Sequence, residues 1–139
     1  MNIHQQLVND CLIIGRFPLC HLLLMNDANY PWFILVPDRA NITEIFQLDE
    51  PEQKQLITES SVLSRTIASG FNADKINIAA LGNLVPQLHI HHIVRYTSDA
   101  TWPSPVWGKL PARPYYDDEV KQTINRLQPG LGESFEFNS

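Results

Sequence analysis

The stretch from Asn83 to Arg95 constrains the fold more than any other part of the chain. It reads Asn-Leu-Val-Pro-Gln-Leu-His-Ile-His-His-Ile-Val-Arg and holds three of the five histidines. Its apolar and polar residues alternate, which is typical of a β-strand whose side chains point in turn to two faces. The alternation puts Gln87, His89 and His91 on one face, and the other face takes Leu88, Ile90, His92 and Val94. A core does not require such a polar row, so the sequence predicts a functional site here.

Helix signals on both sides of this strand predict an α+β fold. Glu52 follows Asp49 by three residues, as in a capping box, and predicts a helix over 49–69. A second helix is expected to be capped by Asp117 and to end before Pro129, because its apolar residues recur at helical spacing. This second helix lies near the C-terminal end of the chain.

Further strands are expected before the main helix and after it. Phe17–Met25 and Trp32–Val36 are apolar runs joined by the turn-forming residues 26–31, so they predict an antiparallel hairpin. Lys75–Leu81 is expected to be another strand. No repeat, low-complexity tract or linker interrupts the sequence, and we expect residues 1–139 to form a single α+β domain.

Composition excludes several classes of function. The chain has 139 residues, 44% of them hydrophobic, and a net charge of −5, which argues against nucleic acid as a partner. No stretch has the length of a membrane span, and the apolar run from Cys11 lacks the features of a signal peptide. Cys11 and Cys20 are expected to be free thiols. We therefore expect a cytoplasmic protein.

The chemistry of the histidine row is open on the residues alone. A neutral imidazole held by its other nitrogen can attack phosphorus, and a second imidazole about 7 Å along the strand can assist the leaving group. A His-x-His pair can also hold a metal ion, although no further ligand is singled out by its spacing. The row could equally be structural, or bind a nucleotide without reacting. These interpretations are close to even at this level.

The sequence resembles the histidine triad (HIT) superfamily, whose signature strand reads His-x-His-x-His. The similarity follows the order of elements from Phe17 to Trp107. Within the superfamily it is most similar to a bacterial branch that reads Asn-x-Val-Pro-Gln-Leu-His-x-His, followed by Trp-Pro-x-Pro-x-Trp-Gly. Residues 83–91 and 102–108 match these two strings.

This resemblance implies roles for individual residues. His89 takes the position of the central histidine, the nucleophile that accepts a nucleotidyl group, and His91 that of the last histidine, which contacts the phosphate and the leaving group. Gln87 replaces the first histidine. Asn83 matches a residue that binds phosphate or the leaving group, and Asn26 falls near an asparagine that contacts the nucleoside.

The main departure from the family pattern is that Gln87 stands in place of the first histidine. A glutamine can form hydrogen bonds but carries no proton, so the chemistry is expected to be weakened or redirected rather than lost. A fourth phosphate-facing histidine of several branches would fall near Phe33 and is missing. We interpret His92 as packed or on the surface, Arg95 as an exposed arginine at the strand end, and Trp107 as a lid or dimer contact.

The resemblance further implies the architecture and activity. We expect an antiparallel sheet of about five strands with the long helix on one face, and a homodimer. The implied activity is that of a nucleotide hydrolase or nucleotidyl transferase that cleaves a phosphoramidate or phosphoanhydride bond through a nucleotidyl-histidine, with no metal and no cofactor. The substrate would be a nucleotide or nucleotide conjugate. The alternatives are a weak or inactive nucleotide-binding protein and a His-x-His metal-binding protein.

Overall fold

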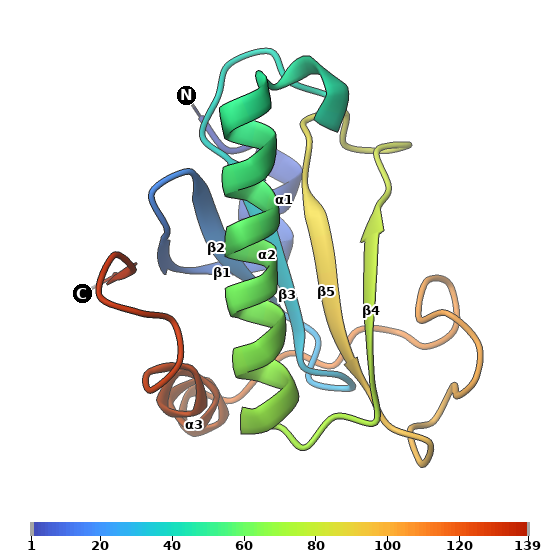
Figure 1. Ribbon diagram of the computed structural model, residues 1–139. Helices are drawn as coiled ribbons and strands as arrows, with labels where there is room; N and C mark the ends of the chain where they lie inside the picture. The colour runs from blue at the N-terminus through green and yellow to red at the C-terminus, as the bar shows by residue number, and fades with distance from the viewer. Residues whose placement is uncertain (1, 139) are drawn as a thin grey trace.

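A computed structural model describes residues 2–138 and has an α+β fold (Figure 1). The antiparallel sheet of these residues has six strands in the order β4-β5-β3-β2-β1-β6, which confirms the expected sheet of about five, since β6 has only two residues. The elements in chain order are α1 (Gln5–Asp10), β1 (Cys11–Arg16), β2 (Cys20–Met25), β3 (Trp32–Pro37), η1 (Ile45–Gln47), α2 (Glu50–Gly70), β4 (Lys75–Ala80), β5 (Ile90–Arg95), α3 (Asp117–Leu127) and β6 (Glu136–Phe137).

The main helix, α2, lies across one face of the sheet (Figure 1). The predicted capping box is confirmed: the Asp49 carboxylate accepts from the backbone N–H of Glu52 at 2.9 Å, and the Glu52 carboxylate accepts from that of Asp49 at 3.2 Å. Asp49 is the cap, and the helix runs one residue past the predicted end. The sheet-facing stripe is fully buried and consists of Leu56, Leu63 and Ile67.

The predicted hairpin is formed by β2 and β3, which pair antiparallel with Cys20 opposite Pro37. The adjacent strand β1 is irregular at Gly15, where its register with β2 shifts. A Cβ on Gly15 would lie 2.1 Å from the backbone oxygen of Glu136, so only glycine lets β6 approach β1 this closely. The C-terminal helix is confirmed, but Tyr116 is its cap and Asp117 its first residue.

The signature strand is shorter than predicted, because β5 begins at Ile90. Residues 83–89 form an irregular approach to it, since Pro86 has no N–H with which to pair in a ladder. The alternation of faces nevertheless holds. Ile90 and Val94 pack into the core beneath α2, whereas Ile93 packs into a second apolar cluster on the opposite face. The sheet therefore separates a helix-covered side from the side that carries His91.

His92 points to the helix-covered side and is completely buried, in agreement with its interpretation as a packed residue. Its Nδ1–H donates to the carbonyl oxygen of Ile90 at 3.0 Å, so its Nε2 accepts from the hydroxyl of Ser60 on α2 at 2.7 Å. Both nitrogens of a neutral ring are thereby used. Burial lowers the pKa of His92 from 6.5 to about 4, although the bond to Ile90 acts in the opposite direction.

Acid is therefore expected to destabilise the fold through His92. The pKa of His92 is lower in the folded than in the unfolded state. The free energy of unfolding is therefore unaffected by the titration of this residue above pH 6.5 and decreases as the pH falls from 6.5 towards about 4. At ~1.4 kcal/mol per pKa unit, this difference corresponds to roughly 3 kcal/mol. Urea unfolding at pH 7, 5.5 and 4.5 measures the loss. The double variant Ser60→Ala/His92→Leu should show a shallower decrease, and equal slopes for the two proteins would contradict this account.

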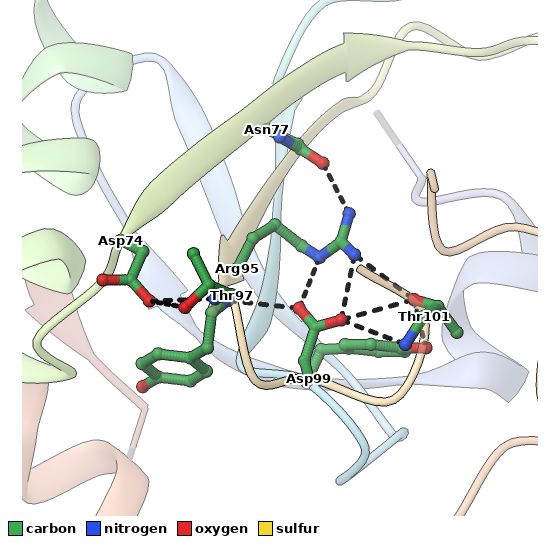
Figure 2. Close-up of polar contacts among 8 residues, drawn as sticks. Asp74, Asn77, Arg95, Thr97, Asp99 and Thr101 are labelled. Atoms are coloured by element: carbon green, nitrogen blue, oxygen red, sulfur yellow. Dashed lines mark hydrogen bonds and ion pairs between the residues drawn. The ribbon is translucent and has the colours of Figure 1, made fainter. Parts of the chain in front are cut away.

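The interpretation of Arg95 as an exposed arginine at the strand end is wrong. The residue is buried, with 1% of its surface accessible. Its guanidinium forms two bonds with the carboxylate of Asp99, at 2.8 and 3.0 Å, and donates to Asn77 at 2.9 Å (Figure 2). It also lies 5.7 Å from the ring centroids of Tyr30 and Trp102. These contacts fix the start of the loop that follows β5.

Two remaining expectations concern cysteines and membranes. Cys11 and Cys20 are free thiols, as predicted. Burial raises the pKa of both, so neither is an activated nucleophile. Among residues 2–138, the helices are too short or too polar to cross a bilayer.

Candidate active site

A cavity of about 670 Å³ lies on the side of the sheet opposite α2. Its walls come from α1, the end of β2, the start of β3, the segment before β5 and the loop that carries Trp107. The residues that line it are His4, Gln6, Leu7, Asp10, Met25, Trp32, Leu81, Asn83, Leu84, Val85, His89, His91 and Trp107. The cavity is mostly apolar, and its floor carries the two signature histidines.

His89 is held in the orientation that a nucleophile needs. Its Nδ1 lies 2.8 Å from the carbonyl oxygen of Gln87, two residues earlier in the chain. A carbonyl can only accept, so Nδ1 carries the proton and Nε2 keeps its lone pair. Within residues 2–138, no hydrogen bond engages that Nε2. His89 as a residue is 5% exposed and lines the cavity, so its lone pair is available to a bound electrophile.

His91 is in the opposite tautomer. The indole Nε1–H of Trp32 donates to its Nδ1 at 2.9 Å, and because an indole can only donate, the proton of the neutral ring is on Nε2. Burial, followed by the proximity of His89 and His92, lowers the pKa of His91 to about 3. At neutral pH His91 is thus a fixed, uncharged hydrogen-bond donor.

Aromatic rings keep the two histidines together. The ring centroids of His89 and His91 are 4.9 Å apart, with the planes at 70°. Trp107 lies with its centroid 5.1 Å from that of His91 and 5.8 Å from that of Trp32, in both cases edge to face. This contact brings the loop after β5 over the site, and it agrees with the interpretation of Trp107 as a lid.

The tautomers argue against the metal-binding alternative. The Nδ1 atoms of His89 and His91 are both hydrogen-bonded, so a shared ion would need a lone pair from each Nε2. The bond from Trp32 leaves the Nε2 of His91 protonated. Within residues 2–138, no group of three or more His, Cys, Asp or Glu side chains is placed to hold a metal ion.

Comparison with known proteins identifies the family of this chain. The family model described as HIT domain matches residues 6–98, which is most of the chain. The chain belongs to the HIT family. A histidine triad protein from Bradyrhizobium japonicum is 47% identical over 94% of this chain and 98% of its own, with a TM-score of 0.92. A histidine triad protein from Marinobacter aquaeolei VT8 is also 47% identical, over 96% of this chain and 97% of its own, with a TM-score of 0.92.

More distant HIT structures share the fold. A histidine triad protein from Sinorhizobium meliloti 1021 is 41% identical over 94% of this chain and 96% of its own, with a TM-score of 0.91. A hypothetical histidine triad nucleotide-binding protein from Sulfolobus tokodaii strain7 is only 12% identical, with 91% of this chain and 89% of its own covered and a TM-score of 0.67, so that similarity concerns the fold alone. A search of the curated proteins finds no match.

The other residues assigned from the HIT motif lie in different places. Asn83 lines the cavity with His89 and His91. Asn26 lies in an adjoining hollow of about 360 Å³, where its side-chain oxygen accepts from the backbone N–H of Tyr115 at 2.8 Å. A role for Asn26 in nucleoside binding stays a prediction.

Gln87, the residue at the first HIT histidine position, turns towards the start of the chain. Its side-chain oxygen accepts from the backbone N–H of His4 at 2.7 Å, and its amide donates to the carbonyl oxygen of Asn2 at 3.0 Å. It lines a hollow of about 420 Å³ with these two residues and Arg39. Its backbone carbonyl accepts from Nδ1–H of His89.

Sequence reasoning missed the functional position of Trp32. The missing fourth histidine of the HIT site was expected near Phe33, but Phe33 packs into the core beneath α2. Its neighbour Trp32 faces the cavity and sets the tautomer of His91. The period of two along β3 could have identified the correct face, because Trp32 is paired with Ile93, which lies on the same side of the sheet as His91.

Proposed function

We propose that this chain is a one-domain, cytoplasmic nucleotide hydrolase or nucleotidyl transferase of the HIT type. Its substrate class is a nucleotide conjugate with a phosphoramidate or phosphoanhydride bond. The observation that carries the proposal is the pair of opposite tautomers in one cavity: His89 offers a lone pair on Nε2, and His91 offers an Nε2–H. A nucleophile beside a fixed donor is the arrangement that transfer at phosphorus requires.

The first step transfers the nucleotidyl group to the protein. The lone pair on Nε2 of His89 attacks phosphorus, the new N–P bond forms, and the bond from phosphorus to the leaving group breaks. A leaving amine takes up a proton from water. His91 donates from Nε2–H to a phosphoryl oxygen, so charge that develops there is stabilised without a proton transfer from His91.

The second step restores the histidine. Water attacks the phosphorus, the N–P bond to His89 breaks, and the proton lost by the water goes to solvent. The products are a nucleoside monophosphate and, from a phosphoramidate, a free amine. Throughout both steps the carbonyl of Gln87 holds Nδ1–H, and this bond strengthens when the ring becomes positively charged.

The apolar part of the cavity suits the nucleoside of such a substrate. Leu7, Met25 and Val85 provide aliphatic walls, while Trp32 and Trp107 provide aromatic ones. A volume of about 670 Å³ is within the usual range of small-molecule sites. The polar end with Asn83, His89 and His91 then receives the phosphate.

A direct assay tests the proposal. Purified protein incubated with an adenosine phosphoramidate should release AMP, and rapid quenching followed by intact-mass measurement should detect the added mass of a nucleotidyl group. A peptide map should place that mass on the segment with His89. A protein that only binds nucleotides would be stabilised by AMP in thermal unfolding but would release no product. That outcome would reject the enzymatic assignment.

We also propose that the chain pairs into a homodimer through the β4 edge of the sheet and α2. The strand β4 is the last of the sheet order, and the apolar side chains of Ile78 and, on α2, Ile57 are exposed by 53% and 63%. Light scattering after size exclusion should give twice the chain mass of 15.9 kDa. Charged substitutions at both positions, Ile57→Lys and Ile78→Lys, should return the mass to that of one chain.

A further inference from the structure

A third histidine lines the cavity and has no role in the HIT motif. His4 immediately precedes α1 and lines the cavity with His89 and His91. Its Nδ1 accepts from the backbone N–H of Gln6 at 3.0 Å, as a helix cap. A backbone N–H can only donate, so the neutral ring carries its proton on Nε2. Within residues 2–138, that Nε2 has no hydrogen-bond partner.

The segment that carries His4 is fastened by Gln87. Two side-chain bonds of this glutamine go to the backbone of Asn2 and His4, so they hold this part of the chain without involving the imidazole of His4. His4 and Gln87 are 83 positions apart in the sequence. The side chain that replaces the first triad histidine therefore holds in place a segment that brings another imidazole to the same cavity.

We propose that His4 is the third imidazole of this site, and that its Nε2–H donates to a phosphoryl oxygen of the bound nucleotide. Gln87 is a positioning residue that acts through the backbone of residues 2–4. This inference rests on the proposed function. Gln87 has no imidazole to contact the phosphate, and His4 makes that contact in its place.

The electrostatics of the cavity give such a donor a specific use. Of the described residues 2–138, those that line the cavity include no Lys or Arg, and their one carboxylate, Asp10, adds negative charge. The pKa of His91 is lowered to about 3, so His91 gives a hydrogen bond but no positive charge. A phosphoryl group that accumulates charge in this cavity needs a further donor. His4 provides one, because the bond from Gln6 to its Nδ1 leaves the proton on Nε2.

Kinetics of the His4→Asn variant test the proposal. Asparagine retains the capping oxygen and removes the imidazole, so α1 should remain folded. With adenosine phosphoramidate as substrate, kcat/KM should fall about 10- to 100-fold, as for loss of one hydrogen bond to a charged group. The matched control is Gln5→Ala, since Gln5 is an exposed neighbour bonded to Asn9 and does not line the cavity. This control should keep the wild-type kcat/KM.

The positioning role of Gln87 is tested by a double-mutant cycle. Gln87→Ala should lower kcat/KM to a similar extent, because the segment is released and His4 leaves the site. The double variant His4→Asn/Gln87→Ala should then be no slower than the slower single variant. If the two effects multiply, Gln87 acts independently of His4 and the positioning role is wrong.

An AMP titration followed by NMR of the histidine rings gives a readout without turnover. The imidazole signal of His4 should shift together with those of His89 and His91, whereas His21, which is outside the cavity, should not respond.

If wild-type protein hydrolyses the substrate, His4→Asn is as fast as wild type and the His4 signal is unmoved, the inference fails and the proposed function stands. If wild-type protein does not hydrolyse it, the proposed function fails. The AMP-induced shift of His4 and a weaker AMP affinity of His4→Asn then decide the inference.

Discussion

The His89→Ala variant is expected to lose at least about 10³-fold in turnover of an adenosine phosphoramidate, because a covalent mechanism has no route around its nucleophile. The structure gives the reason in atomic terms. The Nε2 lone pair of His89 exists only because the carbonyl of Gln87 holds the proton on Nδ1, 2.8 Å away. Initial rates of AMP release measure the effect, and the mass of the trapped adduct should disappear with it.

The matched control for this prediction is His21→Ala. His21 lies on β2, is only partly buried and does not line the cavity, so its removal should leave the rate within about twofold of wild type. AMP should still raise the unfolding temperature of His89→Ala, which shows that the site is folded. Equal rates for wild type and His89→Ala would remove the catalytic role from this residue.

The largest expected effect on stability comes from Arg95→Met. Methionine fills much of the volume but leaves the carboxylate of Asp99 buried without its partner, and such a loss costs about 3–5 kcal/mol. In the wild type the two bonds from Arg95, helped by the backbone N–H groups of Tyr96 and Thr101, lower the pKa of Asp99 to about 2, and the variant loses the contribution of Arg95. The unfolding temperature should fall by roughly 10–20 °C.

Two further variants separate charge from packing. Arg95→Met/Asp99→Asn removes both charges and should recover part of the lost stability, because no buried carboxylate is left unpaired. Arg126→Met removes another arginine that lies over an aromatic ring, that of Phe71 at 5.1 Å, but on the surface, and should cost less than about 1 kcal/mol. If Arg95→Met is as mild as Arg126→Met, the buried network contributes little.

The elements were predictable because their signals are local. The capping box of Asp49 and Glu52 spans three residues, and the hairpin of β2 and β3 surrounds a turn rich in Asn and Pro. The start of β5 was misplaced because the alternation of side chains continues through 87–89, where the backbone no longer pairs. Period-two patterns record which way side chains point, and they do not show where a ladder begins.

The site itself was predictable only where the motif names the residue. His89 and His91 came from the signature, whereas the partners that set their tautomers come from contacts without a local pattern. Trp32 is 59 positions from His91 in the sequence. Arg95 is paired with Asp99, which lies in the loop after β5, and the composition of that loop predicts only irregular structure. Gln87 was recognised as a departure, but its bonds to the other end of the chain are apparent only in three dimensions.

His91 and His92 are adjacent in the chain yet serve opposite sides of β5, one in the cavity and one against Ser60 of α2. A strand of this kind lets selection act on reactivity and on foldability through different residues of one short peptide. Substrate preference can drift by changes at the cavity wall while the helix-facing half stays fixed. Directed evolution of this scaffold should therefore randomise the cavity wall apart from His89 and His91, and leave the even-numbered positions of β5 alone.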